Sequence, residues 1–264
     1  MQLYRLLKFY PMKFILFFLV LISSSAYAQN TSYGVFSYSE VEYVHNKNVE
    51  DVRSIDSITK LFTAKVILDS NVDLDEPVLV QGKSGGRFAK GVKVERYELL
   101  RAMLMSSDNL AAESLAMAHP GGMKQFLYDV NGDIEWMGLK NTVIVDSTGL
   151  LAGNKSTVND LKEFLFVLRR YYLIQRLSSE KHYTTEYRKG KKTIKVNLKN
   201  TNPQIWTYDS IILTKTGFTS AAGRCLAMLV EKGGELYSVI SLGNRTVLER
   251  SRNISDLMNE IGER

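Results

Sequence analysis

The sequence of 264 residues has few of the residues that cross-link a fold or bind metals. Cys225 is its one cysteine, so no disulfide can form within the chain. The three histidines, His45, His119 and His182, are scattered and lack metal-ligand spacing. Cys225 lies in an apolar stretch and is expected to be a buried strand residue. We therefore expect neither a metal site nor a cofactor.

No apolar run in the sequence reaches the length of a membrane span. The run at residues 14–22 has nine residues, against the about 20 that a spanning helix needs. Three basic residues precede it and residues 23–28, which end in Ala26-Tyr27-Ala28, follow, which is typical of a secretory signal peptide. We expect residues 1–28 to be cleaved before Gln29, giving a periplasmic protein with at most peripheral membrane association. An uncleaved anchor and a start at Met12 are the alternatives.

The charge balance gives no indication of nucleic-acid binding. The chain has 34 basic and 28 acidic residues, and loss of residues 1–28 would remove three basic ones, leaving 31 against 28. The densest basic run, residues 188–192, lacks interleaved aromatics and is expected to be a solvated hairpin or loop. Residues 82–91 contain Gly-Lys-Ser but no phosphate-loop spacing, and are expected to form a glycine-rich surface connection.

Hydrophobic periodicity predicts an α+β fold. The predicted strands are residues 33–38, 42–45, 211–214, 225–230 and 236–242. The predicted helices are residues 57–69, 95–105, 109–118, 123–137, 158–171 and 247–261. The order is strands, helices, strands and a final helix, so we expect the first and last strands to share one antiparallel sheet with a helical insertion, roughly residues 80–160, in a single domain at residues 29–264.

Three short motifs occur in order along the chain. They are Ser57-Ile-Thr-Lys60, Ser107-Asp-Asn109 and Lys215-Thr-Gly217. Each motif alone is weak evidence. Together they form the set that is typical of penicillin-binding proteins and class A β-lactamases, and they occupy a predicted helix start, an interhelical loop and a strand.

The first motif predicts an activated serine nucleophile. A hydroxyl and an amine three residues apart on a helix share one face, so Lys60 can accept the Ser57 proton if burial keeps the amine neutral. The backbone N–H groups of Ser57 and Phe218 would then stabilise the oxyanion. A structural role for Lys60 is the alternative in isolation, and the other two motifs disfavour it.

The second motif predicts positioning and proton transfer. Ser107 would pass a proton toward the leaving amine, and Asn109 would hold the substrate amide beside Ser57. The alternative is a plain helix N-cap, which Ser107 or Asp108 could provide alone.

The third motif predicts substrate binding along a strand. Lys215 would supply positive charge that keeps the proton affinity of Lys60 low, and Thr216 would donate a hydrogen bond to a substrate carboxylate. Gly217 would let the substrate backbone approach the strand edge. A strand-end turn is the alternative for Lys-Thr-Gly alone.

Further segments carry a resemblance to a known family. They are residues 104–109, 119–122, 147–150, 156–157, 200–202, 213–219 and 222–223. With the three motifs, they make the chain similar to the D-alanyl-D-alanine carboxypeptidases and endopeptidases, and within them to the penicillin-binding protein 7 type of endopeptidase. The resemblance runs from about residue 33 to 261.

This resemblance implies a transpeptidase-like fold, a five-stranded antiparallel sheet with flanking helices and an inserted helical subdomain. It implies that Ser57 is acylated by peptidoglycan stem peptides or by β-lactam antibiotics, which would inhibit it covalently. It also suggests that Arg250 meets the substrate carboxylate, with a solvated helix-start arginine as the alternative.

One departure from the family pattern concerns the residue before the nucleophile. Asp56 stands where the family has a small residue, and a carboxylate there could hold Lys60 or Lys215 protonated. The leading hypothesis is a D-Ala-D-Ala endopeptidase that cleaves cross-links. A carboxypeptidase and a catalytically impaired wall-binding or penicillin-binding protein are the alternatives.

A β-lactamase is a third possibility, because Asp108 also occurs in β-lactamases. The stretch 146–150 lacks the glutamate that such enzymes use to activate water. Asp146 is a poor substitute for it, since its side chain is shorter.

Overall fold

A five-stranded sheet forms the centre of the computed structural model, which describes residues 31–262. The expected signal at residues 1–28 lies outside these described residues. The sheet is antiparallel with the order β2-β1-β11-β10-β9. Its strands are β1 (Ser32–Ser37), β2 (Glu42–Lys47), β9 (Ile211–Thr219), β10 (Gly223–Lys232) and β11 (Glu235–Asn244). Val35 of β1 lies opposite Val239 of β11, which confirms that the first and last segments share one sheet.

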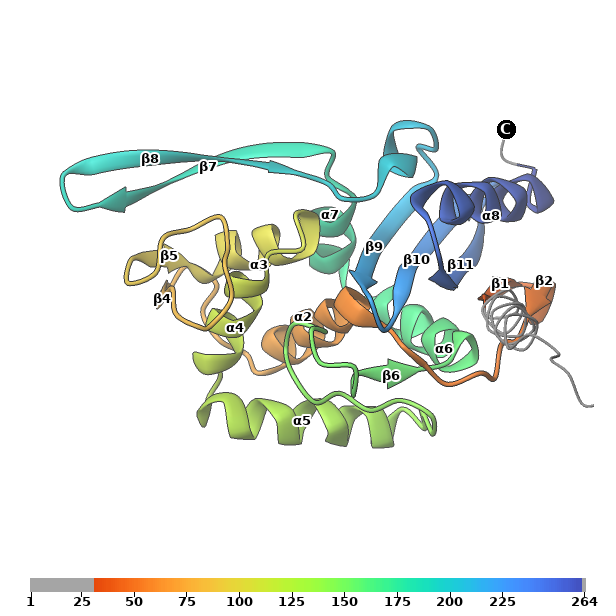
Figure 1. Cartoon of the computed structure of the whole chain (residues 1–264), viewed down its shortest axis with the longest axis horizontal. Coiled ribbons are helices and arrows are strands. Elements are labelled where there is room, and N and C mark those ends of the chain that lie inside the picture. The colour runs from red at the N-terminus through yellow and green to blue at the C-terminus, as the bar shows by residue number, and fades with distance from the viewer. Residues whose placement is uncertain (1–30, 263–264) are drawn as a thin grey trace, which may run out of the picture. The chain divides into compact units, whose positions relative to one another are not determined.

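Seven helices surround the sheet in the described part of the chain (Figure 1). They are α2 (Thr59–Asp69), α3 (Arg96–Met105), α4 (Asn109–Met117), α5 (Gly122–Trp136), α6 (Val158–Leu168), α7 (Tyr172–Ser179) and α8 (Val247–Glu260). Helices α6 and α8 contact β11, α7 contacts the edge strand β9, and α3, α4 and α5 gather around α2. The expected α+β architecture, a five-stranded antiparallel sheet with flanking helices, is therefore confirmed.

Strand β10 separates two hydrophobic cores. Alternate side chains of a strand point to opposite faces, and both faces of this strand are covered. Leu226 packs in a cluster with Ile254 of α8, whereas Cys225 and Ala227 belong to the larger core shared with the other helices. The continuous apolar run at residues 225–230 follows from this double burial, and Cys225 is buried in a strand as predicted.

Helix α2 is the axis of the helical half. Every residue from Thr59 to Ile67 is buried, so this helix is covered on all sides rather than on one apolar face. Phe62 stacks on Phe164 of α6 with ring centroids 3.6 Å apart. The stack holds the N-terminal end of α2 against α6, and the turn before α2, which contains Ser57, contacts β9 and β10 of the sheet.

Three small two-stranded sheets complete the fold. They pair β3 (Arg53–Ser54) with β6 (Lys155–Ser156), β4 (Pro77–Leu79) with β5 (Lys93–Glu95), and β7 (His182–Lys189) with β8 (Lys192–Lys199). The β7–β8 hairpin turns at Gly190, whose φ of +60° suits glycine. Figure 1 shows this hairpin reaching away from the helices beside β4 and β5.

Several elements differ from the sequence-based expectation. Ser57 lies in a 3₁₀ turn, η1 (Asp56–Ile58), and α2 itself begins at Thr59. The predicted helix at 158–171 ends at Leu168, and α7 follows as a separate helix that was not predicted. The hairpin or loop expected at residues 188–192 is the tip of the β7–β8 hairpin, so that prediction is confirmed, whereas the strands on either side of the tip were not predicted.

Candidate active site

Ser57 sits on a strained turn against the end of strand β9. The preceding residue, Asp56, has a φ of +48°, which is uncommon for a side chain other than glycine. A Cβ at Gly149 would lie 2.0 Å from the Asp56 carbonyl oxygen, and a Cβ at Gly217 would lie 3.1 Å from the Ser57 nitrogen. The two glycines therefore leave room for the nucleophile turn, and β9 passes directly against it.

Lys60 is completely buried beside the nucleophile. Its Nζ lies 2.9 Å from Ser57 Oγ, 2.7 Å from Asn109 Oδ1 and 2.5 Å from the Thr148 carbonyl oxygen. A neutral amine has two N–H donors and one lone pair. Asn109 and Thr148 can accept both donors, so the lone pair is left facing the Ser57 hydroxyl. The geometry thus fits a general base.

Burial sets the proton affinity of Lys60. It lowers the pKa of this amine to about 8, while the carboxylates of Asp56 and Asp146 oppose the shift. With such a pKa, about one lysine in ten is neutral at pH 7. Lys60 can therefore act as a base near neutral pH, which an ordinary lysine cannot.

The Ser107 loop meets strand β9 on the other side of the site. Lys215 Nζ donates a hydrogen bond to Ser107 Oγ at 2.9 Å. Ser107 has a φ of +57°, and Asp108 holds its loop by accepting hydrogen bonds from the backbone N–H groups of Ala111 and Arg87. Asp108 is therefore the N-cap of α4, which leaves the Ser107 hydroxyl available for the site.

Lys215 is as buried as Lys60. Burial lowers the pKa of Lys215 well below its ordinary value, and the charge of Lys60 lowers it further. The pKa of Lys60, by contrast, is set by burial and by nearby carboxylates. The Thr216 hydroxyl, next along β9, donates to Thr201 Oγ at 2.6 Å, which fixes its orientation at the strand edge.

The end of β9 carries an exposed aromatic residue, Phe218, and two arginines of other elements belong to the same region, Arg224 of β10 and Arg250 of α8. Phe218 is 54% exposed, and the Arg224 guanidinium lies 4.2 Å from its ring centroid. Arg250 is only 6% exposed, so the alternative of a solvated arginine is wrong. Burial and the nearby Arg224 lower the pKa of Arg250. Sequence reasoning missed Arg224, which no motif marks.

Asp56 is buried inside this cationic site. It is 1% exposed, and its Oδ2 has no hydrogen-bond partner among the described residues. Its charge acts to raise the pKa values of both Lys60 and Lys215, which is the direction expected from the sequence. Lys60 nevertheless keeps its contact with Ser57, so Asp56 does not disrupt the geometry of the pair.

Asp146 organises the loop that holds Lys60, and sequence reasoning missed this role. It accepts hydrogen bonds from the backbone N–H groups of Thr148, Gly149 and Leu151. These bonds outweigh burial, which alone would raise its pKa, and hold the pKa of Asp146 below its usual range. An aspartate followed by Ser-Thr-Gly is typical of such a turn. These hydrogen bonds fix the turn that presents the Thr148 carbonyl to Lys60.

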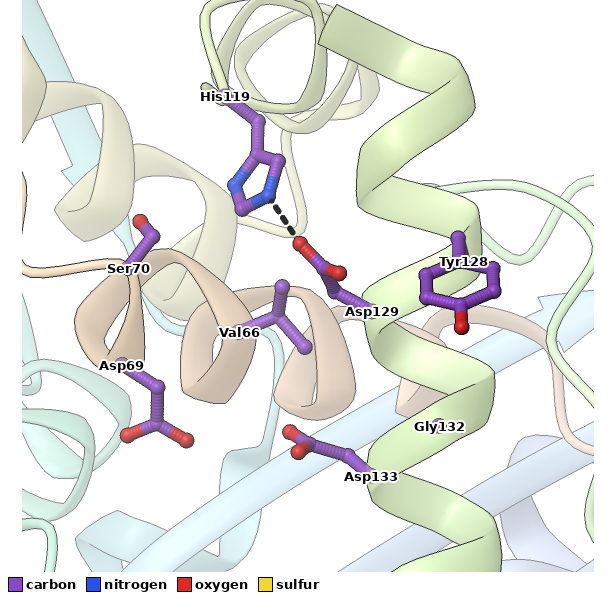
Figure 2. Close-up of a pocket in the computed structure, with 8 residues that line it drawn as sticks. All are labelled: Val66, Asp69, Ser70, His119, Tyr128, Asp129, Gly132 and Asp133. Carbon is purple, nitrogen blue, oxygen red and sulfur yellow. Dashed lines mark hydrogen bonds and ion pairs between the residues drawn. The ribbon is translucent and has the colours of Figure 1, made fainter. Parts of the chain in front are cut away.

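A hollow lies at the C-terminal end of α2, the end that is farther from Ser57 (Figure 2). Figure 2 shows His119 directed at Asp129, and their atoms are 2.7 Å apart. Lys65 neutralises two further carboxylates here, Asp69 and Asp133. Within residues 31–262, no group of three or more potential ligands is arranged for a metal ion, and no helix is long and apolar enough to cross a membrane.

A family model described as D-alanyl-D-alanine carboxypeptidase matches residues 28–246. The chain belongs to this family. Among curated members of the family, D-alanyl-D-alanine endopeptidases of Pseudomonas aeruginosa and Escherichia coli are 40% and 38% identical over 196 and 194 residues. In both cases the match covers 70% of this chain and 62% of the relative. The endopeptidase of Haemophilus influenzae is 30% identical and covers 94% of this chain and 86% of its own.

Solved structures of similar proteins share this carboxypeptidase-family fold. The Streptomyces K15 DD-transpeptidase has a TM-score of 0.81 at 26% identity, and the match covers 88% of this chain and 96% of the other. Penicillin-binding protein D2 from Listeria monocytogenes, in its ampicillin-bound form, has a TM-score of 0.77 at 25% identity, with 87% and 95% covered.

Proposed function

We propose that this protein is a peptidoglycan DD-peptidase, and specifically a D-alanyl-D-alanine endopeptidase that works through an acyl-serine. The observation that carries the proposal is the contact of a buried Lys60 with Ser57, Asn109 and Thr148. The three endopeptidases that resemble the chain at 30–40% identity favour the same activity.

The first two motifs, which contribute Ser57, Lys60 and Asn109, would carry out acylation. Ser57 Oγ attacks the carbonyl carbon of the D-alanyl peptide bond while its proton passes to the Lys60 lone pair. The backbone N–H groups of Ser57 and Phe218 then stabilise the oxyanion. Asn109 keeps the substrate amide in register, since it is already fixed by its contact with Lys60.

Collapse of the tetrahedral intermediate breaks the C–N bond and releases an amine. The proton taken by Lys60 must reach that amine, and Ser107 is placed to relay it because Lys215 orients its hydroxyl. Water then attacks the ester, the same groups act in reverse, and Ser57 is regenerated.

The substrate would lie along the edge of β9. β9 is an edge strand, and α7 covers its first half, where the Thr214 N–H donates to Ser178, so the peptide would lie along the second half of the strand. Thr216 and Gly217 contribute the hydroxyl and the free space along this edge, and Arg250 would attract the carboxylate of the stem peptide. β-Lactams would acylate Ser57 in the same place and act as covalent inhibitors.

Carboxypeptidase activity is the second candidate, because it uses the same acylation and differs only in the leaving amine. In an endopeptidase the amine belongs to a neighbouring stem peptide, whereas in a carboxypeptidase it is free D-alanine. The chain's 25% identity to a carboxypeptidase of Bacillus subtilis is weaker than its match to the endopeptidases, which favours cross-link cleavage.

A wall-binding protein without catalysis is the third candidate, and Asp56 is the observation behind it. A buried carboxylate beside Lys60 favours the protonated amine. Because burial outweighs this effect in the pKa of Lys60, we favour a working enzyme. A periplasmic location after signal cleavage is part of the proposal.

The test combines labelling and digestion. The purified protein and its Ser57→Ala variant are incubated with a fluorescent penicillin, and separately with cross-linked muropeptide dimers and uncross-linked pentapeptides. We expect an adduct on Ser57, release of monomers from dimers, and slower release of D-alanine. Faster D-alanine release would establish the carboxypeptidase. No adduct would leave a binding protein, and rapid turnover of the penicillin would indicate a β-lactamase.

A further inference from the structure

Two segments of the chain concentrate positive charge outside the active site. Residues 83–93 contain four basic side chains and residues 188–195 contain five, and neither segment contains an acidic residue. The first segment joins β4 to β5, and the second is the tip of the β7–β8 hairpin. The nine basic residues are Lys83, Arg87, Lys90, Lys93, Arg188, Lys189, Lys191, Lys192 and Lys195. We call these two segments the basic arm.

The two segments of the basic arm are held together by contacts around Tyr187. The Tyr187 hydroxyl accepts a hydrogen bond from the Ala89 backbone N–H at 3.3 Å, and its ring meets that of Phe88 edge to face at 5.6 Å. A groove between β5 and the hairpin is lined by Lys93, Arg188 and Lys195 of the arm and also by the acidic residues Glu95, Glu98 and Glu186, so the excess of positive charge lies at the hairpin tip and on the residue 83–90 loop. Figure 1 shows β4 and β5 beside the hairpin. The charges therefore belong to one surface.

The positive charges of the basic arm are not neutralised within the described chain. All nine side chains are exposed, and none forms an ion pair with an acidic residue in residues 31–262. The nearby arginines of α3 behave differently, since Arg96 pairs with Glu76 and Arg101 with Glu180. The arm thus presents a cationic surface that is open to an anionic partner.

The basic arm is connected to the catalytic loops at its base. Strand β8 ends at Lys199, whose carbonyl accepts a hydrogen bond from Ser106 Oγ, and the chain continues to Thr201 beside Thr216. On the other segment, the Arg87 backbone donates to Asp108. Both segments therefore start at the rim of the site and lead away from it.

We propose that the basic arm binds the carboxylates of neighbouring stem peptides in cross-linked peptidoglycan, beyond the bond that is cut. This inference rests on the proposed function. A polymer with a carboxylate on every stem peptide matches a row of unpaired cations, and several weak contacts along one chain reinforce each other. A small soluble fragment does not reach the arm and gains nothing from it.

The chemistry of the tip favours this partner over a membrane or a nucleic acid. The exposed side chains at residues 188–193 are basic or threonine, while Tyr187 and Val196 are buried against the body. Membrane-surface binding relies on an exposed apolar face, and single-stranded nucleic acid on exposed aromatic rings. The tip has neither.

The test measures binding to insoluble walls in a Ser57→Ala background, so that digestion does not interfere. The arm variant carries Lys189→Ala, Lys191→Ala and Lys192→Ala, and a second arm variant carries arginine at these positions. The matched control carries Lys47→Ala, Lys124→Ala and Lys140→Ala, three exposed lysines on β2, on α5 and just after α5. Walls are stripped of phosphate polymers with hydrofluoric acid, and half are amidated to block their carboxylates.

We expect the alanine arm variant to bind stripped walls about tenfold more weakly than the control at low salt. The arginine variant should bind like the parent, and amidated walls should remove the difference, as should high salt. Penicillin labelling, measured with Ser57 restored, should be equal in all variants, which shows that they are folded.

Equal wall binding by the arm variant and the control would overturn the inference. So would a difference that persists on amidated walls, or one seen with anionic phospholipid vesicles instead of walls. The dimer digestion separates the two proposals. If the parent enzyme cleaves no dimers but the basic arm still increases binding to walls, the proposed function is wrong and the inference about the basic arm is retained.

Discussion

Lysine has opposite properties in two regions of this molecule. In the active site, Lys60 and Lys215 are fully buried and burial lowers both pKa values. On the β7–β8 hairpin, Lys191 and Lys192 are exposed and unpaired with acids. The comparison shows that the surroundings, and not the residue type, decide whether a lysine acts as a base or as a fixed positive charge.

The strongest test of the buried region removes the nucleophile. Ser57→Ala should abolish the penicillin adduct and reduce dimer cleavage by at least about 10⁴-fold, because no other hydroxyl is paired with Lys60. Mass spectrometry and chromatography measure the two losses. An adduct that persists in this variant would place the nucleophile elsewhere.

Exchange of lysine for arginine compares the two regions directly. Lys60→Arg keeps a positive charge but removes the base, since a guanidinium stays protonated, and acylation should slow by about 10³-fold. Arginine at positions 189, 191 and 192 should change wall binding little, because only charge matters there. Penicillin acylation rates measure the first effect. If arginine at position 60 left acylation as little changed as arginine at positions 189, 191 and 192 leaves wall binding, the contrast between the two regions would be wrong.

The loop that supports Lys60 should depend on Asp146. Asp146→Ala removes the acceptor of three backbone N–H groups and should lower the free energy of unfolding by about 2–4 kcal/mol, measured by urea denaturation. Because the folded pKa of Asp146 is depressed, its stabilisation is present above the unfolded carboxyl pKa. It is lost as the pH falls through the lower folded value.

A matched control for this variant is Asp209→Ala. Asp209 lies on the surface, where its ion pair with Lys181 is solvated. Its substitution should therefore lower the free energy of unfolding by less than about 1 kcal/mol. Equal destabilisation by the two variants would mean that Asp146 does not organise the loop.

A smaller effect is expected from substitution of Asp56, because its carboxylate shifts the pKa of Lys60 but makes no hydrogen bond to Lys60. Asp56→Asn removes a negative charge that raises the pKa of Lys60. The pKa should fall, more lysine should be neutral below pH 8, and acylation at pH 6.5 should become several-fold faster. Stopped-flow labelling with a fluorescent penicillin measures this rate. A slower variant would show that Asp56 supports catalysis in another way.

The sequence predicted the sheet and most helices because their signals are local. The apolar run at residues 225–230 identifies a strand, and Asp108, the N-cap of α4, marks a helix start. A hairpin or loop was expected at residues 188–192, but the full strands of the hairpin at residues 182–199 were not, because few of its side chains, such as Val196 and Leu198, are apolar. Its stability comes from contacts with other segments, which a linear pattern does not contain.

The motifs predicted which side chains form the centre of the site, but they did not predict the groups that other loops and strands bring to it. The three motifs identified Ser57, Lys60 and Lys215, and the structure brings them together. The Thr148 carbonyl that contacts Lys60, and the arginine at 224, carry no motif, because their positions depend on how distant loops fold. The roles of all these residues in catalysis stay predictions.

The most direct test of the account is the pH dependence of Ser57 acylation. The rate should rise from about pH 6 to a plateau above about pH 9, with a midpoint near the Lys60 pKa of about 8. Asp56→Asn should move that midpoint to lower pH. A rate that is flat across this range, with the adduct still on Ser57, would contradict the claim that a buried neutral Lys60 activates the serine.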